Sequence, residues 1–64
     1  MISSYEAAQS ALDHIEAIER RLKMLKQMIN PQTGTVTDKQ VMAGLVVSSE
    51  DEMIDLRNDL MRFL

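Results

Sequence analysis

The 64-residue sequence contains no cysteine and no tryptophan, and it has one histidine, one proline and two glycines. Disulfide bonds are therefore excluded, and one histidine without cysteine cannot form a zinc site by itself. Domains of this size are marginally stable, and those without a disulfide or a metal usually gain stability from a second subunit. We expect residues 1–64 to form a single small domain that self-associates.

Aromatic residues make up 3% of the sequence, and its net charge is -3. An acidic chain with few rings lacks both the positive charge that attracts phosphates and the surfaces on which bases stack, so nucleic acid is an unlikely partner. No stretch is apolar enough to span a bilayer, and no basic segment followed by an apolar core indicates a signal peptide. We therefore expect a cytoplasmic protein without membrane contact.

Signatures of catalysis are also missing from the sequence. It has no glycine-rich phosphate loop and no nucleophile motif, so we expect no enzyme activity and no cofactor. His14 flanks the main apolar stripe, and we interpret it as a side chain at the rim of an interface rather than as a metal ligand.

A seven-residue repeat of apolar side chains dominates the first half of the sequence. Its members are Ala8, Ala11, Ile15, Ile18, Leu22, Leu25 and Ile29. The alternating steps of three and four residues place them on one stripe of a helix, and such a stripe packs against another helix.

Local signals give the limits of this first helix. Ser3 and Glu6 have the spacing of a capping box, and Pro31 cannot continue a helix. We expect a helix over residues 4–29 and a loop over residues 30–37.

A short second helix is expected over residues 38–46. Thr37 and Gln40 have the spacing of its capping box, whereas Gly44 weakens its continuation.

A third helix is expected over residues 50–63, because Ser49 and Glu52 have the spacing of a further capping box. The fold class is thus all-α: one long helix and two shorter helices form a hairpin, which assembles with other copies into a helical bundle.

The function expected from this pattern is non-enzymatic and depends on protein–protein contacts. The chain would be a homodimer or higher oligomer that also binds another protein. Its role would be that of an adaptor, a chaperone-like protein, an inhibitor or an accessory protein, for example of the phage or plasmid type. The residues expected at the interface are Leu12, Ile15, Ile18, Leu22, Leu25, Met28, Ile29 and Arg57.

A helix-turn-helix over residues 37–57 is the alternative. Ala43 occupies the position in the first helix that requires a small residue, and Lys39, Arg57 and Arg62 would contact DNA. The turn glycine of that motif is missing, and the acids at the start of the second helix would repel phosphates. Packing of two helices within a bundle is the favoured interpretation.

Two acidic pairs, Glu16 with Glu19 and Glu52 with Asp55, each place two carboxylates one helical turn apart. They resemble the paired acidic motifs of the all-helical MazG-type nucleoside triphosphate pyrophosphohydrolases. The resemblance implies magnesium-dependent nucleotide hydrolysis. None of the four residues belongs to the seven-residue repeat, and solvated acids are the favoured interpretation.

Overall fold

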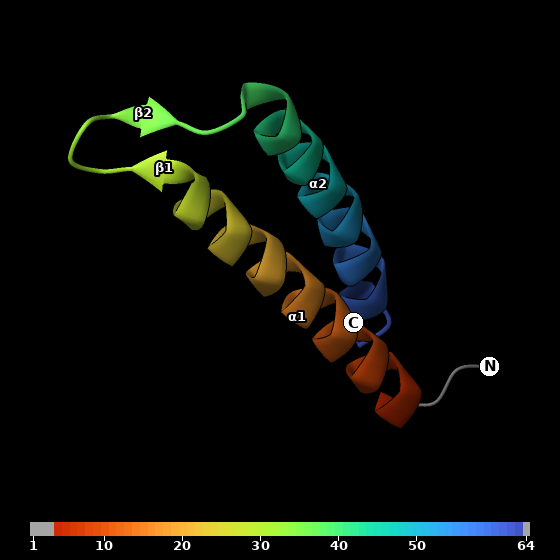
Figure 1. The fold of residues 1–64 in the computed structure, drawn as a ribbon. Helices are drawn as coiled ribbons and strands as arrows, with labels where there is room; N and C mark the ends of the chain where they lie inside the picture. The colour runs from red at the N-terminus through yellow and green to blue at the C-terminus, as the bar shows by residue number, and fades with distance from the viewer. Residues whose placement is uncertain (1–3, 64) are drawn as a thin grey trace.

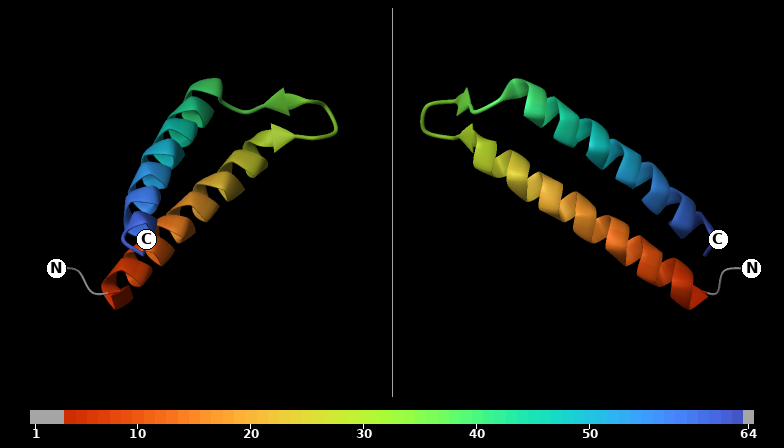
Figure 2. Two further views of the ribbon diagram at one scale, coloured as in Figure 1. Left: turned by 180° about the vertical axis from the view of Figure 1, so that it is seen from behind. Right: turned by 45° about the vertical axis from the view of Figure 1, so that its right-hand side comes forward.

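The computed structural model describes residues 4–63 as a helical hairpin. Helix α1 (Ser4–Met28) and helix α2 (Lys39–Met61) run side by side in opposite directions, and strands β1 (Ile29–Asn30) and β2 (Thr35–Val36) connect them (Figure 1). The two further views confirm an elongated, two-layered shape (Figure 2), with extents of 50 × 17 × 15 Å. The expected hairpin is confirmed.

The two helices face each other along a seam in which residues recur at alternating steps of three and four. On α1 the buried and half-buried residues of this seam are Ala7, Ala11, His14, Ile18, Arg21, Leu25 and Met28. On α2 they are Met42, Leu45, Ser49, Glu52, Leu56 and Asp59. This periodicity is typical of helices that pack lengthwise.

The core of the hairpin is small. Among the described residues, the buried apolar side chains are those of Ala7, Ala11 and Ile18, and no large side chain is completely buried. The alanines place little bulk between the helices at the amino-terminal end of α1. The hairpin by itself therefore removes little apolar surface from water.

A tight β-hairpin occupies most of the expected loop over residues 30–37. Ile29 pairs with Val36, and Asn30 pairs with Thr35. The Asn30 side chain accepts a hydrogen bond from the backbone N–H of residue 32, and Gly34 adopts a φ of 69°, which favours glycine. These contacts end α1 at Met28, one residue earlier than expected.

The expectation of two short helices after the loop is wrong, because α2 is a single continuous helix. Ser49 does not cap a new helix: its hydroxyl donates a hydrogen bond of 2.8 Å to the carbonyl oxygen of Leu45 within α2. Its small side chain is 4% exposed and lies in the seam against α1. Packing thus outweighs the weak helix propensity around Gly44 and Ser49.

The amino-terminal cap of α2 also differs from the expectation. Asp38, not Thr37, caps the helix, since its carboxylate accepts hydrogen bonds from the backbone N–H groups of Gln40 and Val41. Thr37 instead donates its backbone N–H and its hydroxyl to the carbonyl oxygen of Met28. The capping box at Ser3 lies outside the described residues.

The continuous helix bears directly on the alternative function. A helix-turn-helix requires a turn between its two helices, and residues 37–57 provide none after α2 begins at Lys39. In the described part of the chain, neither helix has an apolar stretch long enough to cross a membrane.

Candidate interaction surface

Apolar side chains continue beyond the seam on one side of the hairpin. Successive side chains of an α-helix point 100° apart around its axis. Because α1 and α2 are antiparallel, the residue that directly follows a seam residue lies on the same side of the hairpin in both helices. The residues found there, which we call the apolar face, are Leu12, Ile15, Leu22 and Ile29 on α1 and Val46, Met53 and Leu60 on α2. Two stripes thus form one surface along the molecule.

Most of the apolar face is open to solvent. Leu22 and Met53 are each 47% exposed, and Leu12, Ile29, Val46 and Leu60 are exposed to a similar extent. A shallow hollow on α2 is lined by Met53, Leu56, Arg57, Leu60 and Met61. Arg57 therefore lies at the edge of apolar surface, with its side chain exposed. A contiguous apolar surface of this kind is typical of a binding interface.

Charges of both signs border the apolar face. By the same helical rotation, Glu19 and Lys26 lie beside it on α1, and Glu50 and Arg57 lie beside it on α2. Two acids and two bases leave this border without net charge. Two copies of the face can therefore approach each other without net like-charge repulsion.

The exposed surface of the whole chain is large for its mass. A compact monomer of 7.3 kDa exposes about 4200 Å² by the usual scaling of surface with mass. This chain exposes 5142 Å². The excess of about 1000 Å² is comparable with the roughly 800 Å² that each partner contributes to a standard interface.

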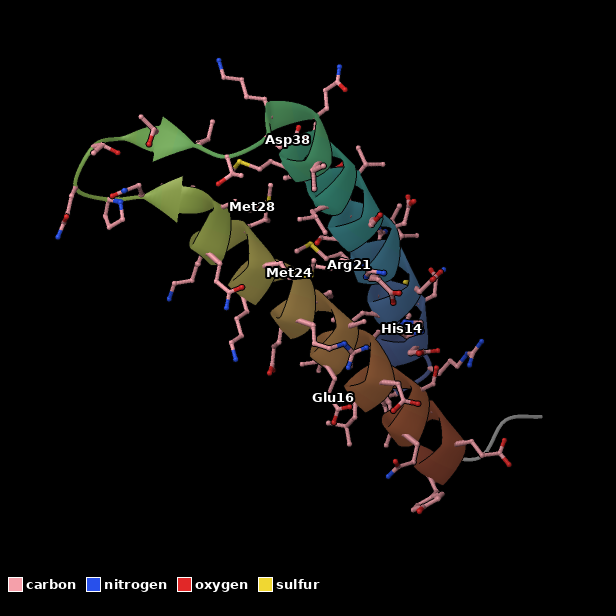
Figure 3. All side chains as sticks on the ribbon, in the orientation of Figure 1. His14, Glu16, Arg21, Met24, Met28 and Asp38 are labelled. Atoms are coloured by element: carbon pink, nitrogen blue, oxygen red, sulfur yellow. The ribbon has the colours of Figure 1, made fainter. Side chains whose placement is uncertain are left out.

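A polar cluster, which consists of His14, Arg21, Glu52, Asp55 and Asp59, lies in the seam and on its side away from the apolar face. His14 of α1 lies between two carboxylates of α2: its Nδ1 is 2.5 Å from Glu52 Oε2, and its Nε2 is 3.5 Å from Asp59 Oδ2. Arg21 Nη1 is 3.3 Å from Glu52 Oε1. Figure 3 shows His14 and Arg21 directed from α1 toward α2.

These contacts change the protonation of two groups in the polar cluster. The hydrogen bond to Glu52 raises the pKa of His14, and burial opposes that shift. The hydrogen bond from His14 lowers the pKa of Glu52, with Arg21 contributing in the same direction. Both shifts favour the charged forms of the two groups, so they stabilise an ion pair between the two helices.

The structure does not bring the two acidic pairs together. Glu16 and Glu19 are exposed on α1, whereas Glu52 lies in the seam. In the described residues, the group with metal-ligand spacing contains His14, Glu52 and Asp55, and no acid of the first pair. The arrangement implied by the resemblance to the MazG-type enzymes is therefore not formed within the hairpin.

The residues expected at the interface fall into two groups. Ile18 is buried in the seam and Leu25 and Met28 are half-buried there, so these three side chains pack within the hairpin. The other five lie on the apolar face or at its border: Leu12, Ile15, Leu22, Ile29 and Arg57. The repeat identified in the sequence thus contains parts of two different surfaces.

Sequence reasoning missed the polar cluster. His14 is seven residues from Arg21, and Glu52 is seven residues from Asp59, which is the spacing of the seam itself. That spacing between polar residues was the available signal. It is easily overlooked because apolar side chains define a seam in most helical pairs.

Comparisons of this chain with protein-family models, with curated proteins and with solved structures gave no match.

Proposed function

We propose that this chain forms a homodimer by pairing its apolar face with that of a second copy, and that the resulting four-helix bundle acts through protein–protein contacts. In this proposal the protein is a non-enzymatic interaction module. The observation that carries it is the apolar face, a stripe from each helix whose six exposed members are each between 43% and 50% exposed.

Energetics support a second copy as the occupant. The seam buries three small or medium apolar side chains among the described residues, which is little for a chain that must order 64 residues. Pairing two apolar faces would bury Leu22, Met53 and their neighbours in a common core. Each side chain of this kind contributes roughly 1.5–3 kcal/mol when it passes from full exposure to full burial.

Shape and charge support the same occupant. A two-layered hairpin with one apolar side becomes a four-helix bundle when two copies stack, and this is a common helical architecture. The border of the apolar face carries equal numbers of acids and bases, so the self-complementary interface of a two-fold dimer is electrostatically acceptable.

A matched pair of substitutions tests the proposal. Leu22→Glu places a charge on the apolar face, whereas Met24→Glu places the same charge on α1 away from that face. Leu22 is 47% exposed and Met24 is 49% exposed, so both changes have a similar effect on a single hairpin. We expect light scattering coupled to size exclusion to give twice the 7.3 kDa chain mass for the wild type and Met24→Glu, and a monomer for Leu22→Glu.

Two results would contradict the proposal. One is a folded wild-type monomer at all concentrations, because the apolar face would then have no second copy. The other is a dimer that Leu22→Glu leaves intact, because the contact would then lie elsewhere. Loss of helical structure in Leu22→Glu together with loss of the dimer agrees with the proposal, since the bundle supplies most of the core.

A further inference from the structure

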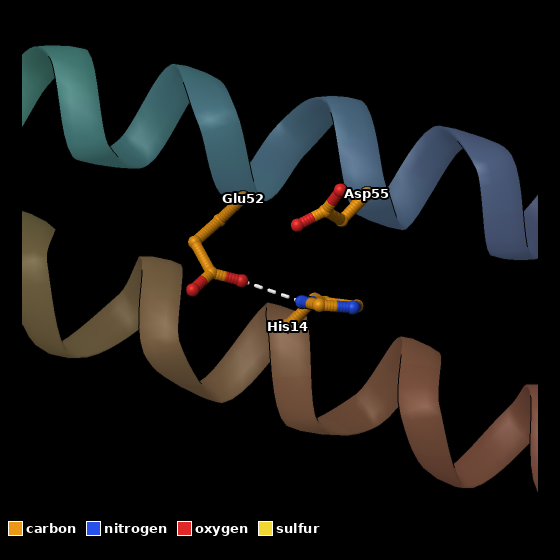
Figure 4. Close-up of side chains that lie close together, drawn as sticks. All are labelled: His14, Glu52 and Asp55. Atoms are coloured by element: carbon orange, nitrogen blue, oxygen red, sulfur yellow. Dashed lines mark hydrogen bonds and ion pairs between the residues drawn. The ribbon is translucent and has the colours of Figure 1, made fainter.

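Three side chains that can bind metal ions lie together between the two helices. One ring nitrogen of His14 and one carboxylate oxygen each of Glu52 and Asp55 lie within 4.8 Å of one another (Figure 4). Asp59 adds a second contact to the same imidazole, through its Oδ2 at 3.5 Å from Nε2. The ligands come from both helices, so an ion bound here would link α1 to α2.

Asp59 contacts the imidazole through its second ring nitrogen. Its side chain is 7% exposed, and its Oδ2 lies 3.5 Å from His14 Nε2 without forming a hydrogen bond of ordinary geometry. A buried carboxylate oxygen gains from a donor at closer range, and an imidazole that carries its proton on Nε2 provides one. The Oδ1 of Asp59 is 3.3 Å from Arg62 Nη1, so Oδ2 is the atom that faces His14.

We propose that His14, Glu52 and Asp55 bind a divalent transition-metal cation of the Zn²⁺ class between the two helices, and that Asp59 orients the imidazole. Asp59 accepts the Nε2 proton, which leaves the Nδ1 lone pair for the metal. A carboxylate behind a metal-binding histidine is a common arrangement, because it fixes the tautomer and increases the basicity of the ligand.

The positions of the three ligands are compatible with this role after small movements. Zn²⁺ binds imidazole nitrogen and carboxylate oxygen at about 2.0–2.2 Å, which places tetrahedral ligands roughly 3.4 Å apart. Glu52 Oε2 would move away from its present 2.5 Å contact with Nδ1, and Asp55 would move closer. Glu52 is partly exposed and Asp55 is exposed, so both side chains have room to rotate. Water would complete the coordination.

The charge balance also favours a cation. The cluster contains three carboxylates, those of Glu52, Asp55 and Asp59, of which Arg21 pairs with Glu52 and Arg62 pairs with Asp59. Metal binding requires His14 to be neutral, and the cluster then carries one uncompensated negative charge. The imidazole nitrogen selects Zn²⁺ and related ions over Mg²⁺ and Ca²⁺, which prefer oxygen ligands.

The proposed metal ligands include no residue of the apolar face, so the contacts of the metal site and of the proposed dimer do not overlap. A folded wild-type monomer could still bind Zn²⁺, and a dimer could lack the metal site, so the two tests give separate answers.

Titration of the metal-free protein with Zn²⁺ at about pH 8, where the ring can lose its proton, tests the site. Because His14 is the single histidine, its ring resonances in the NMR spectrum report binding at this position without ambiguity. We expect saturable changes of the ring signals and a rise in the melting temperature as Zn²⁺ joins the helices. Mg²⁺ at the same concentrations should leave the ring signals unchanged.

Asp55→Asn is the decisive variant, because Asp55 is exposed and the hairpin folds without using its carboxylate in the seam. We expect this change to weaken Zn²⁺ binding at least about tenfold. Asp13→Asn, which removes the same charge beside His14 in sequence but on the outer side of α1, should change binding less than about twofold, as expected for screened surface charges. Equal effects of the two variants, or ring signals that do not respond to Zn²⁺, would overturn the proposal.

Discussion

At the residue scale, His14 is the side chain whose chemistry matters most for the hairpin. One ring nitrogen contacts the carboxylate of Glu52 and the other lies near that of Asp59, so His14 connects α1 to α2 at two positions. A charged imidazole satisfies both carboxylates at once, whereas a neutral ring donates only one proton. The strength of this connection therefore depends on pH.

Stability should be greatest between the ordinary pKa values of these two groups, 4.5 for Glu52 and 6.5 for His14. The pKa of His14 is raised, so the stability that it contributes is complete below pH 6.5 and is lost as the pH rises through its folded-state pKa. The pKa of Glu52 is lowered, so the stability that it contributes is complete above pH 4.5 and is lost as the pH falls through its folded-state pKa. We expect thermal unfolding with a chelator present to show this maximum.

His14→Gln is the control for this pH dependence. Glutamine keeps a polar side chain in the seam and cannot become charged. The decline in melting temperature on the alkaline side of the maximum should be absent from this variant. If the wild type and His14→Gln show the same decline, the ion pair with Glu52 does not stabilise the hairpin.

His14 and Arg21 explain why the apolar repeat predicted only part of the surface with which α1 packs against α2. The apolar repeat correctly placed Ala11, Ile18 and Leu25 against the neighbouring helix. It also assigned Ile15 and Leu22 to that surface, but His14 and Arg21 occupy the corresponding seam positions. A pattern of apolar residues cannot reveal a seam that uses ion pairs, so the predicted stripe was rotated toward the apolar face.

At the element scale, the connection and the length of α2 determine the fold. The reversal after Pro31 was predictable, because proline and Gly34 are strong local signals. The continuity of α2 through Ser49 was not, because serine pairs, glycine and valine all weaken a helix locally. The internal hydrogen bond of Ser49 and its burial against α1 depend on the other helix, and local sequence does not contain that information.

The two glycines should respond in opposite directions to substitution by alanine. A Cβ at Gly44, within α2, would meet no atom within 4 Å, so Gly44→Ala should stabilise the protein by about 0.5–1 kcal/mol. A Cβ at Gly34 also has space, but its φ of 69° makes Gly34→Ala unfavourable by about 1–2 kcal/mol. Urea unfolding at one fixed chain concentration measures both. A destabilising Gly44→Ala would indicate that α2 is not continuous there.

At the scale of the whole molecule, the hairpin is elongated, with a thin core and an exposed apolar face. Its 50 Å length is more than twice either of its other extents. Such a shape exposes more surface per residue than a compact domain, so few contacts compensate the entropy of ordering the chain. A second copy adds core without adding chain length, which makes folding and association a single event.

Coupled folding and association should make the melting temperature depend on protein concentration. For a dimer that unfolds to two free chains, an unfolding enthalpy near 0.7 kcal/mol per residue implies a rise of about 10 °C when the chain concentration increases a hundredfold. Circular dichroism melts at about 5 and 500 µM would measure this difference. Met24→Glu should keep the dependence, because its side chain lies away from the apolar face. A melting temperature that is the same at both concentrations would show that the single hairpin is stable alone, and the apolar face would then need an occupant other than a second copy.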